Sequence, residues 1–264
     1  MSDPTHELGD LSTTEVEALS ADAAPVMLLP VGSTEAHGPH LPLATDLIIA
    51  RETARRAAAA LAASEVTALV LPPLAYAVTE FVGAFAGTIS VRADTVRRLI
   101  EEIAASLFRQ GVEVIALVNG HVEPEHARML KHVARDVTAA GDGALLFPDQ
   151  RLPPTVERLG EEFARGGGHA GGYETSLVMA AAPDLVDDEA RRALATNFVD
   201  IAARIKDGAR DAVEAGGPEA YFGDPAAASV AEGERLYFVL SGMVVDAVRA
   251  ARPPAGATDG ATDG

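Results

Sequence analysis

Two short segments of this sequence each place a histidine two residues from a carboxylate. Glu35 and His37 form the first pair, and His121 and Glu123 form the second. In an extended segment, side chains two residues apart point to the same side of the chain. Asp46, which follows the first pair after a Pro-containing loop, adds a third carboxylate. Imidazole nitrogens and carboxylate oxygens are ligands that Zn²⁺ and Mn²⁺ accept, and Fe²⁺ is also possible. Because a shared carboxylate is typical of two-metal hydrolases, the pattern predicts two divalent metal ions per chain.

Each of these features also has a purely structural interpretation. A single histidine after a strand can be a hydrogen-bonded loop residue, Glu35 and Glu123 can be solvated, and Asp46 can cap a helix. Several carboxylates at the mouth of an apolar sheet, however, are costly to bury without a cation. This cost favours the metal hypothesis for the two segments together.

A third segment, GGGHAGGYETS at residues 166–176, combines glycines with polar side chains. The glycines allow the backbone to approach a ligand closely, and His169 would project from the turn. Taken alone, the segment is better explained as a simple turn that places Glu174 at the positive end of a helix. The segment lacks the lysine and hydroxyl residue of a P-loop and the spacing of a dinucleotide-binding fingerprint. We therefore predict no phosphate site here.

Short apolar segments alternate with Ala-rich helical segments along the chain, and the two His-carboxylate pairs follow apolar segments. We expect strands at 26–31, 66–71, 112–119 and 144–147, and helices at 46–63, 94–110, 124–140, from about 174, and at 230–251. This alternation predicts an α/β fold with a mainly parallel sheet and helices on both faces. Ligands bind beyond the carboxyl ends of the strands in such sheets, where both pairs would lie.

No linker divides the chain into comparable halves, so we predict a single domain over residues 1–251. Residues 252–264 repeat ATDG and offer almost nothing to bury, which predicts a disordered C-terminal tail.

Composition excludes several classes of function. The chain has 21 Lys and Arg against 39 Asp and Glu, a formal charge of −18, and no dense basic run. We therefore expect no nucleic-acid partner and no membrane partner, and a small-molecule substrate instead. The absence of cysteine removes thiolate nucleophiles and Cys-based metal sites. No apolar run approaches the roughly 20 residues of a membrane span, and residues 1–20 lack the features of a signal peptide, so we expect a cytoplasmic protein.

Three segments, in the same order, resemble the signature regions of the creatininase (creatinine amidohydrolase) family. They are PVGSTEAHGPHLPLATD at 30–46, VNGHVEPEHARML at 118–130 and GHAGGYETSLVMAAAPDLV at 168–186. Further similarity at 85–90, 223–225 and 231–233 extends the match from about residue 8 to about residue 249. The resemblance implies a three-layer αβα sandwich, two divalent metals, hydrolysis of non-peptide or terminal amide bonds, and a homo-oligomer that is commonly a hexamer.

The resemblance also implies roles for individual residues. One metal would be held by Glu35, Asp46 and His121, and the other by His37, Asp46 and Glu123. His169 falls on the family's substrate-site histidine and Glu174 on the glutamate of its ETS segment, so both are predicted to be catalytic. For substrate binding we predict His169 with three aromatic residues, Tyr76, Phe85 and Tyr173. The roles of His40, His126 and His132 stay open.

The expected reaction is hydrolysis of a cyclic amide or formamide-type C–N bond by a hydroxide bridging two metals. His169 would stabilise the oxyanion or protonate the leaving nitrogen. Creatinine itself is not the expected substrate, because Gly168 stands where creatinine-cleaving members carry a carboxylate and the chain has no tryptophan. Two alternatives are a metallopeptidase that trims a peptide C-terminus, as in mycofactocin maturation, and a non-catalytic metal-binding scaffold.

Overall fold

A computed structural model of the protein describes residues 7–21, 23–165 and 168–252. The predicted disordered tail lies, apart from Arg252, outside the described residues. The strands are β1 (Val26–Val31), β2 (Ala68–Val70), β3 (Val114–Asn119) and β4 (Ala144–Leu146). The longer helices are α2 (Thr45–Ala62), α3 (Ala93–Phe108), α4 (Pro124–Ala140), α7 (Gly172–Ala181) and α11 (Val230–Ala251). The shorter ones are α1 (Thr13–Leu19), α5 (Thr155–Leu159), α6 (Glu161–Ala164), α8 (Asp188–Ala193), α9 (Ile201–Lys206) and α10 (Ala212–Ala215), with 3-10 turns η1 (Leu8–Asp10), η2 (Pro183–Leu185) and η3 (Pro225–Ala227).

The four strands form one parallel sheet in the order β2-β1-β3-β4. The chain moves outward from β1 to β2 on one side, and from β3 to β4 on the other. The strand order therefore reverses between β1 and β3, which is the position where open α/β sheets bind ligands. Val31 pairs with Asn119 at the end of these two strands. Their register brings both following loops to the same edge of the sheet.

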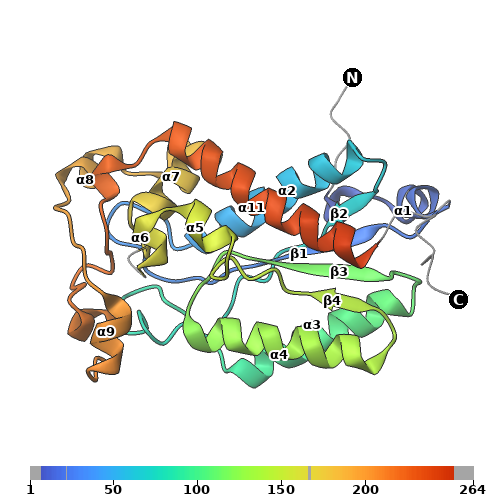
Figure 1. Ribbon diagram of the computed structural model, residues 1–264, viewed down its shortest axis with the longest axis horizontal. Coiled ribbons are helices and arrows are strands. Elements are labelled where there is room, and N and C mark those ends of the chain that lie inside the picture. The colour runs from blue at the N-terminus through green and yellow to red at the C-terminus, as the bar shows by residue number, and fades with distance from the viewer. Residues whose placement is uncertain (1–6, 22, 166–167, 253–264) are drawn as a thin grey trace, which may run out of the picture.

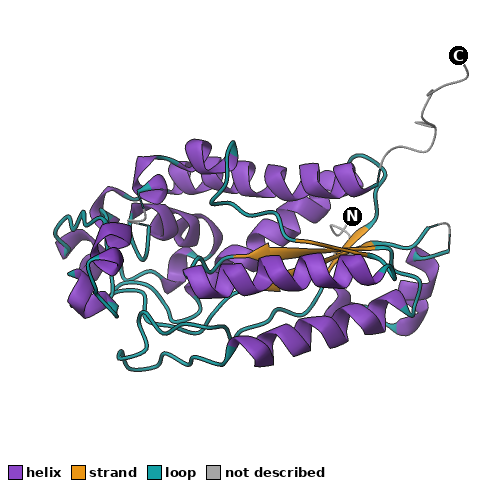
Figure 2. Cartoon of the chain, turned by 60° about the horizontal axis from the view of Figure 1, so that its bottom comes forward, coloured by secondary structure: helices purple, strands orange, loops and turns teal. Residues whose placement is uncertain are grey.

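Helices cover both faces of the sheet, as Figures 1 and 2 show. Alternate residues of each strand point to opposite faces. Leu29 and Leu117 pack against α3 and α4 on one face, and Leu28 and Ala116 pack against α2 and α11 on the other. All six residues of β1 are buried, as expected for a strand covered on both sides. The predicted three-layer α/β architecture is confirmed.

Helix α11 runs from the sheet to the end of the molecule where the short helices gather. It packs against both α2 and α7, and Figure 1 shows α5 to α9 gathered at the end away from the two chain termini. Gly233 permits this crossing, because a Cβ atom there would lie 2.0 Å from the carbonyl oxygen of Ser176 in α7. Helix α11 thus positions α7 against α2.

The bounds of β1, α4 and α11 agree with the sequence prediction, whereas β2 is shorter than expected. Helices α5, α6, α8, α9 and α10 were not predicted, because four to six residues are too few to show helical periodicity. Within the described part of the chain, no helix combines the length and apolar composition that crossing a bilayer requires.

Candidate metal centre

The loops after β1 and β3 converge on the first turn of α2. Asp46 is the second residue of α2, and Gly32 and Gly120 both lie against its backbone. A Cβ atom on Gly120 would lie 2.2 Å from the carbonyl oxygen of Asp46, and one on Gly32 would lie 2.7 Å from the amide nitrogen of Leu47. Only glycine allows this approach, which brings the side chains that follow each strand to Asp46.

The first group of donors consists of Glu35, Asp46 and His121, all buried. The Nδ1 atom of His121 lies 2.9 Å from Oδ2 of Asp46 and 3.4 Å from Oε1 of Glu35. The donor atoms of the three residues lie within 4.8 Å of one another. These three residues are the set that the sequence predicts for one metal ion.

The second group consists of His37, Asp46 and Glu174. The Nε2 atom of His37 lies 3.2 Å from Oδ1 of Asp46 and 3.4 Å from Oε2 of Glu174. Asp46 therefore directs one carboxylate oxygen toward each histidine, Oδ2 toward His121 and Oδ1 toward His37. This is the geometry of a carboxylate that two ions share.

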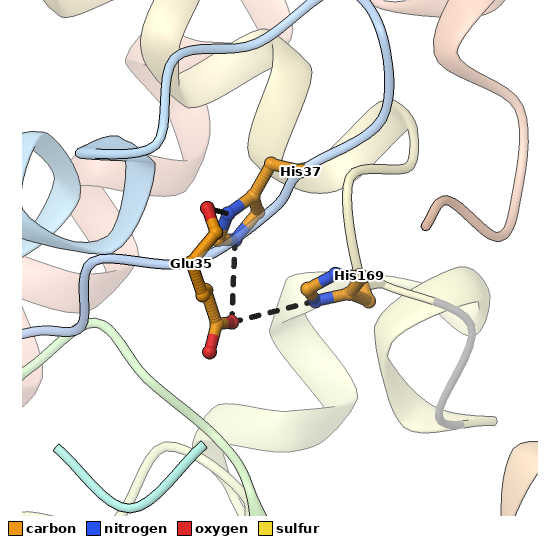
Figure 3. A group of neighbouring side chains, drawn as sticks. All are labelled: Glu35, His37 and His169. Carbon is orange, nitrogen blue, oxygen red and sulfur yellow. Dashed lines mark hydrogen bonds and ion pairs between the residues drawn. The ribbon is translucent and has the colours of Figure 1, made fainter. Parts of the chain in front are cut away.

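His169 lies beside both groups. Its Nδ1 atom is 3.8 Å from Oε1 of Glu35, and its ring centroid is 4.5 Å from that of His37. Figure 3 shows Glu35, His37 and His169 directed toward one another. The Nε2 atom of His169 lies 3.0 Å from the carbonyl oxygen of Ala36, to which it donates. The neutral ring thus presents an unprotonated Nδ1 to the site.

Hydrogen bonds to the backbone fix the orientation of the other two histidines. Nδ1 of His37 lies 3.1 Å from the carbonyl oxygen of Glu35, and Nε2 of His121 lies 2.8 Å from that of Val78. When these nitrogens donate, the opposite nitrogen of each ring is left as a free donor for a metal. Among the described residues, the buried Nε2 of His37 has no hydrogen-bond partner. A bound cation would provide the partner that this nitrogen lacks.

Two hydroxyl groups orient the carboxylates. Ser33 Oγ donates to Oδ2 of Asp46 at 2.7 Å, and Thr79 Oγ1 donates to Oε2 of Glu35. The sequence analysis missed both residues, although Ser33 lies inside the first motif. Thr79 follows β2 and had no local signal. Metal ligands commonly depend on such supporting contacts.

The electrostatics of the cluster favour a cation. Burial opposes ionisation of Glu35, but the charge and hydrogen bond of His121, together with the charge of His37, lower the pKa of Glu35 to about 2. Burial also opposes protonation of His37, yet Asp46 and Glu174 raise the pKa of His37 to about 10. The pKa of His121 is likewise raised well above its usual value, against burial, by Glu35 and Asp46. Protons on these histidines balance the carboxylates in the metal-free protein, and divalent ions would supply the same positive charge.

Two groups of the site, the partly buried His169 and the buried Glu174, are neutral near pH 7 in the absence of metal. Burial, followed by the neighbouring charge of His37, lowers the pKa of His169 to about 4. Burial also raises the pKa of Glu174 to about 8, although His37 opposes the shift. Glu174 additionally accepts a hydrogen bond from the backbone N–H of Ala170 at 2.7 Å.

Glu123 does not belong to either group, although the sequence predicts it as a ligand. Its carboxylate accepts hydrogen bonds from the backbone N–H groups of Glu80 and Phe81, at 3.2 and 3.3 Å. Burial raises its pKa. Glu174, predicted as a catalytic residue, takes the place that Glu123 was expected to fill beside His37 and Asp46.

His126 and His40, whose roles the sequence leaves open, lie outside the donor groups and contact residues next to them. His126 Nε2 lies 3.2 Å from Oδ1 of Asn119, and its ring lies 5.0 Å from that of His121. His40 Nε2 lies 2.9 Å from Oγ1 of Thr175, next to Glu174. His132 is exposed and takes no part in the centre.

A pocket of about 1210 Å³ opens above the donor groups. Of the predicted substrate-binding residues only His169 lines it. Tyr76 is 52% exposed elsewhere on the surface, and Phe85 packs against the cluster around Phe222. Tyr173 is buried in the core, with its ring 4.6 Å from that of Phe163. The structure thus places these three aromatic residues outside the pocket, whose aromatic lining consists of Phe81, Phe163 and Phe198.

Comparison with known proteins places the chain in a family. The sequence model of the creatininase family, described as creatinine amidohydrolase, matches residues 9–248. The chain belongs to the creatininase family. It is accordingly a hydrolase that acts on C–N bonds.

The relatives of this chain within the creatininase family are named either as peptidases or as creatinine amidohydrolases. The mycofactocin precursor peptide peptidase of Mycobacterium ulcerans is 34% identical over 87% of this chain and 86% of its own length. The creatinine amidohydrolase of Pseudomonas putida is 30% identical over 68% of this chain and 73% of its own. A crystal structure of creatinine amidohydrolase superposes with a TM-score of 0.73 and 27% identity, covering 96% of this chain and all of that one. Other solved creatininases are described as Zn-Zn and Mn forms.

Proposed function

We propose that this creatininase-family hydrolase is a two-metal peptidase that cleaves an amide bond of a peptide substrate. The observation that carries the two-metal part is the position of Asp46, whose two carboxylate oxygens face His121 and His37 separately. Glu35 completes the group around His121, and Glu174 completes the group around His37. When bound, two divalent ions would polarise the substrate carbonyl and activate a water molecule.

The protein side chains would hold the ions and move a proton. Ser33 and Thr79 orient the two carboxylates of the first group. The free Nδ1 of His169 faces the site and is unprotonated near pH 7, so it can accept the proton that the attacking water releases. The same atom can then return this proton to the leaving nitrogen. His169 therefore acts as the proton carrier in this proposal.

Three observations support a peptide over a small cyclic amide. The pocket of about 1210 Å³ exceeds the roughly 300–1,000 Å³ of most small-molecule sites. The Mycobacterium ulcerans relative is a peptide peptidase and is similar along most of both chains. Gly168 offers no carboxylate at the pocket, and a Cβ there would only contact Phe163 and Tyr173. Hydrolysis of a cyclic amide or formamide is the second candidate, favoured by the similarity to creatinine amidohydrolase.

Metal analysis and a substrate screen test the proposal. The purified protein should contain close to two Zn, Mn or Fe ions per chain, and Asp46→Ala should lose both ions and all hydrolytic activity. Short peptides, a formamide and a cyclic amide would be compared side by side, with peptides as the expected substrates. Two ions retained in Asp46→Ala would contradict the shared role of Asp46.

A further inference from the structure

Most of the charged side chains that line the pocket above the metal centre are acidic. Its walls carry carboxylates from several elements, among them Glu80, Glu125 and Asp200. The whole chain is also acidic, with a formal charge of −18. An anionic group of a substrate would be repelled from such a pocket unless a cation received it.

Four arginines line the pocket, and three of them have carboxylate partners. Arg151 makes two hydrogen bonds to Asp149, at 2.7 and 2.8 Å. Arg165 pairs with Glu161 at 2.9 Å, and Arg210 pairs with Glu214. These ion pairs neutralise the three guanidinium groups within the protein itself.

Arg128 is the fourth arginine and differs from the others. No hydrogen bond or ion pair to Arg128 occurs within the described residues, although Glu125 lies one helical turn before it in α4. Its side chain is exposed to the pocket, on the same helix whose preceding loop carries His121. A guanidinium group presents parallel N–H donors that match the two oxygens of a carboxylate.

An apolar wall completes this part of the pocket. Phe198, Ile201 and Ile205 all line it, and Phe198 is 67% exposed. Large apolar side chains that stay exposed inside a pocket favour the binding of an apolar group of the ligand. Besides the proposed metal ions, the described part of the pocket therefore offers one unpaired side-chain cation and one apolar surface. This combination matches a peptide with a carboxylate and apolar side chains.

We infer that Arg128 is a specificity-determining residue that binds a carboxylate of the substrate while apolar substrate side chains contact Phe198 and α9. This inference rests on the proposed peptidase function, and it adds the anionic character of the substrate. The carboxylate can be the C-terminus of a peptide or an Asp or Glu side chain, since both offer the same pair of oxygens.

The test uses three N-acetylated tetrapeptides with apolar side chains: one with a free C-terminus, one with a C-terminal amide, and an amide with one Asp. Binding to the chelator-treated, metal-free protein is measured by calorimetry, and cleavage is measured separately with the metal-loaded protein. Arg128→Gln is compared with Arg135→Gln, which makes the same change on an exposed side chain of α4 outside this pocket.

The wild-type protein and Arg135→Gln should bind a carboxylate peptide about tenfold more tightly than the uncharged amide, the usual scale for a charge-assisted contact. Arg128→Gln should lose that preference and leave binding of the uncharged amide unchanged. The peptide that shows the preference identifies the carboxylate as terminal or side-chain. Equal binding of all three peptides by the wild type, or an equal preference in Arg128→Gln, would overturn the inference. Arg128-dependent binding without cleavage would instead overturn the peptidase function alone.

Discussion

Gly120 lies against the backbone of Asp46 so closely that a Cβ atom would come within 2.2 Å of its carbonyl oxygen. This contact joins the end of β3 to the first turn of α2, and with it His121 to Asp46. Gly120→Ala must therefore separate the two ligands or strain the sheet. We expect a loss of stability of about 1–3 kcal/mol, the usual cost of overpacking, together with a lower metal content.

Thermal unfolding and metal analysis of Gly120→Ala check this expectation. Gly242→Ala is a suitable control, because Gly242 lies within α11 and a Cβ there would meet nothing within 4 Å. Alanine in a helix should stabilise the protein by about 0.5–1 kcal/mol relative to glycine. An unchanged Tm and metal content in Gly120→Ala would show that the contact does not constrain the centre.

The identity of the second carboxylate ligand can be tested with two matched substitutions. Glu174→Gln should lose about one of the two metal ions, because Glu174 belongs to the group with His37 and Asp46. Glu123→Gln should retain both ions, since the carboxylate of Glu123 accepts hydrogen bonds from the backbone of Glu80 and Phe81 instead. Metal content per chain distinguishes the two variants. The opposite outcome would restore Glu123 as the ligand.

Ser33 should affect metal affinity without being a ligand. Its hydroxyl donates to the oxygen of Asp46 that faces His121. In Ser33→Ala the carboxylate loses this support, and affinity should fall about 10- to 100-fold, the range found for such outer contacts. Competition with a chelator of known affinity measures the change. Equal affinity in the variant and the wild type would exclude the supporting role.

Metal binding should be accompanied by release of protons. In the metal-free protein the pKa of His37 is raised to about 10 and that of Glu174 to about 8, so both groups are protonated at pH 7.5. An ion must displace these protons, and higher pH removes them in advance. Affinity should therefore increase as the pH rises from 6 to 9.

Calorimetry in buffers of different ionisation enthalpy counts the protons released at pH 7.5. We expect about two to three protons, with His121 as the third group, because its pKa is also raised. At the ordinary pKa values of 6.5 and 4.5, nearly all of these protons would already be absent at this pH. Release of less than one proton would therefore contradict the shifted values.

Sequence reasoning identified the candidate ligands that lie within local motifs and after strands. Glu35, His37 and Asp46 share one segment, and His121 follows the clearest strand, so sheet topology alone brings them to one edge. The same reasoning predicts Glu123 as a ligand, but the chain enters α4 at this residue, and its carboxylate accepts hydrogen bonds from the backbone of residues 80 and 81.

The position of Glu174 could not be predicted from local spacing. It depends on the packing of α7 against α2 and α11, which joins segments more than one hundred residues apart. Tyr173 illustrates the same limit. Adjacent residues of a helix are separated by about 100° around its axis, so Glu174 faces the metal donors while Tyr173 enters the core. Local sequence did not indicate which of the two faces inward.

The packing of α11 across α2 and α7 has a consequence for biosynthesis. The elements that carry Asp46 and Glu174 are held together by α11, which is synthesised after both of them. A nascent chain can form the β1–β3 pairing and gather Glu35, Asp46 and His121 early, but its second donor group stays incomplete until α11 docks. We therefore expect metal loading of that group to follow the docking of α11, and a chain truncated before residue 230 to leave the group unformed.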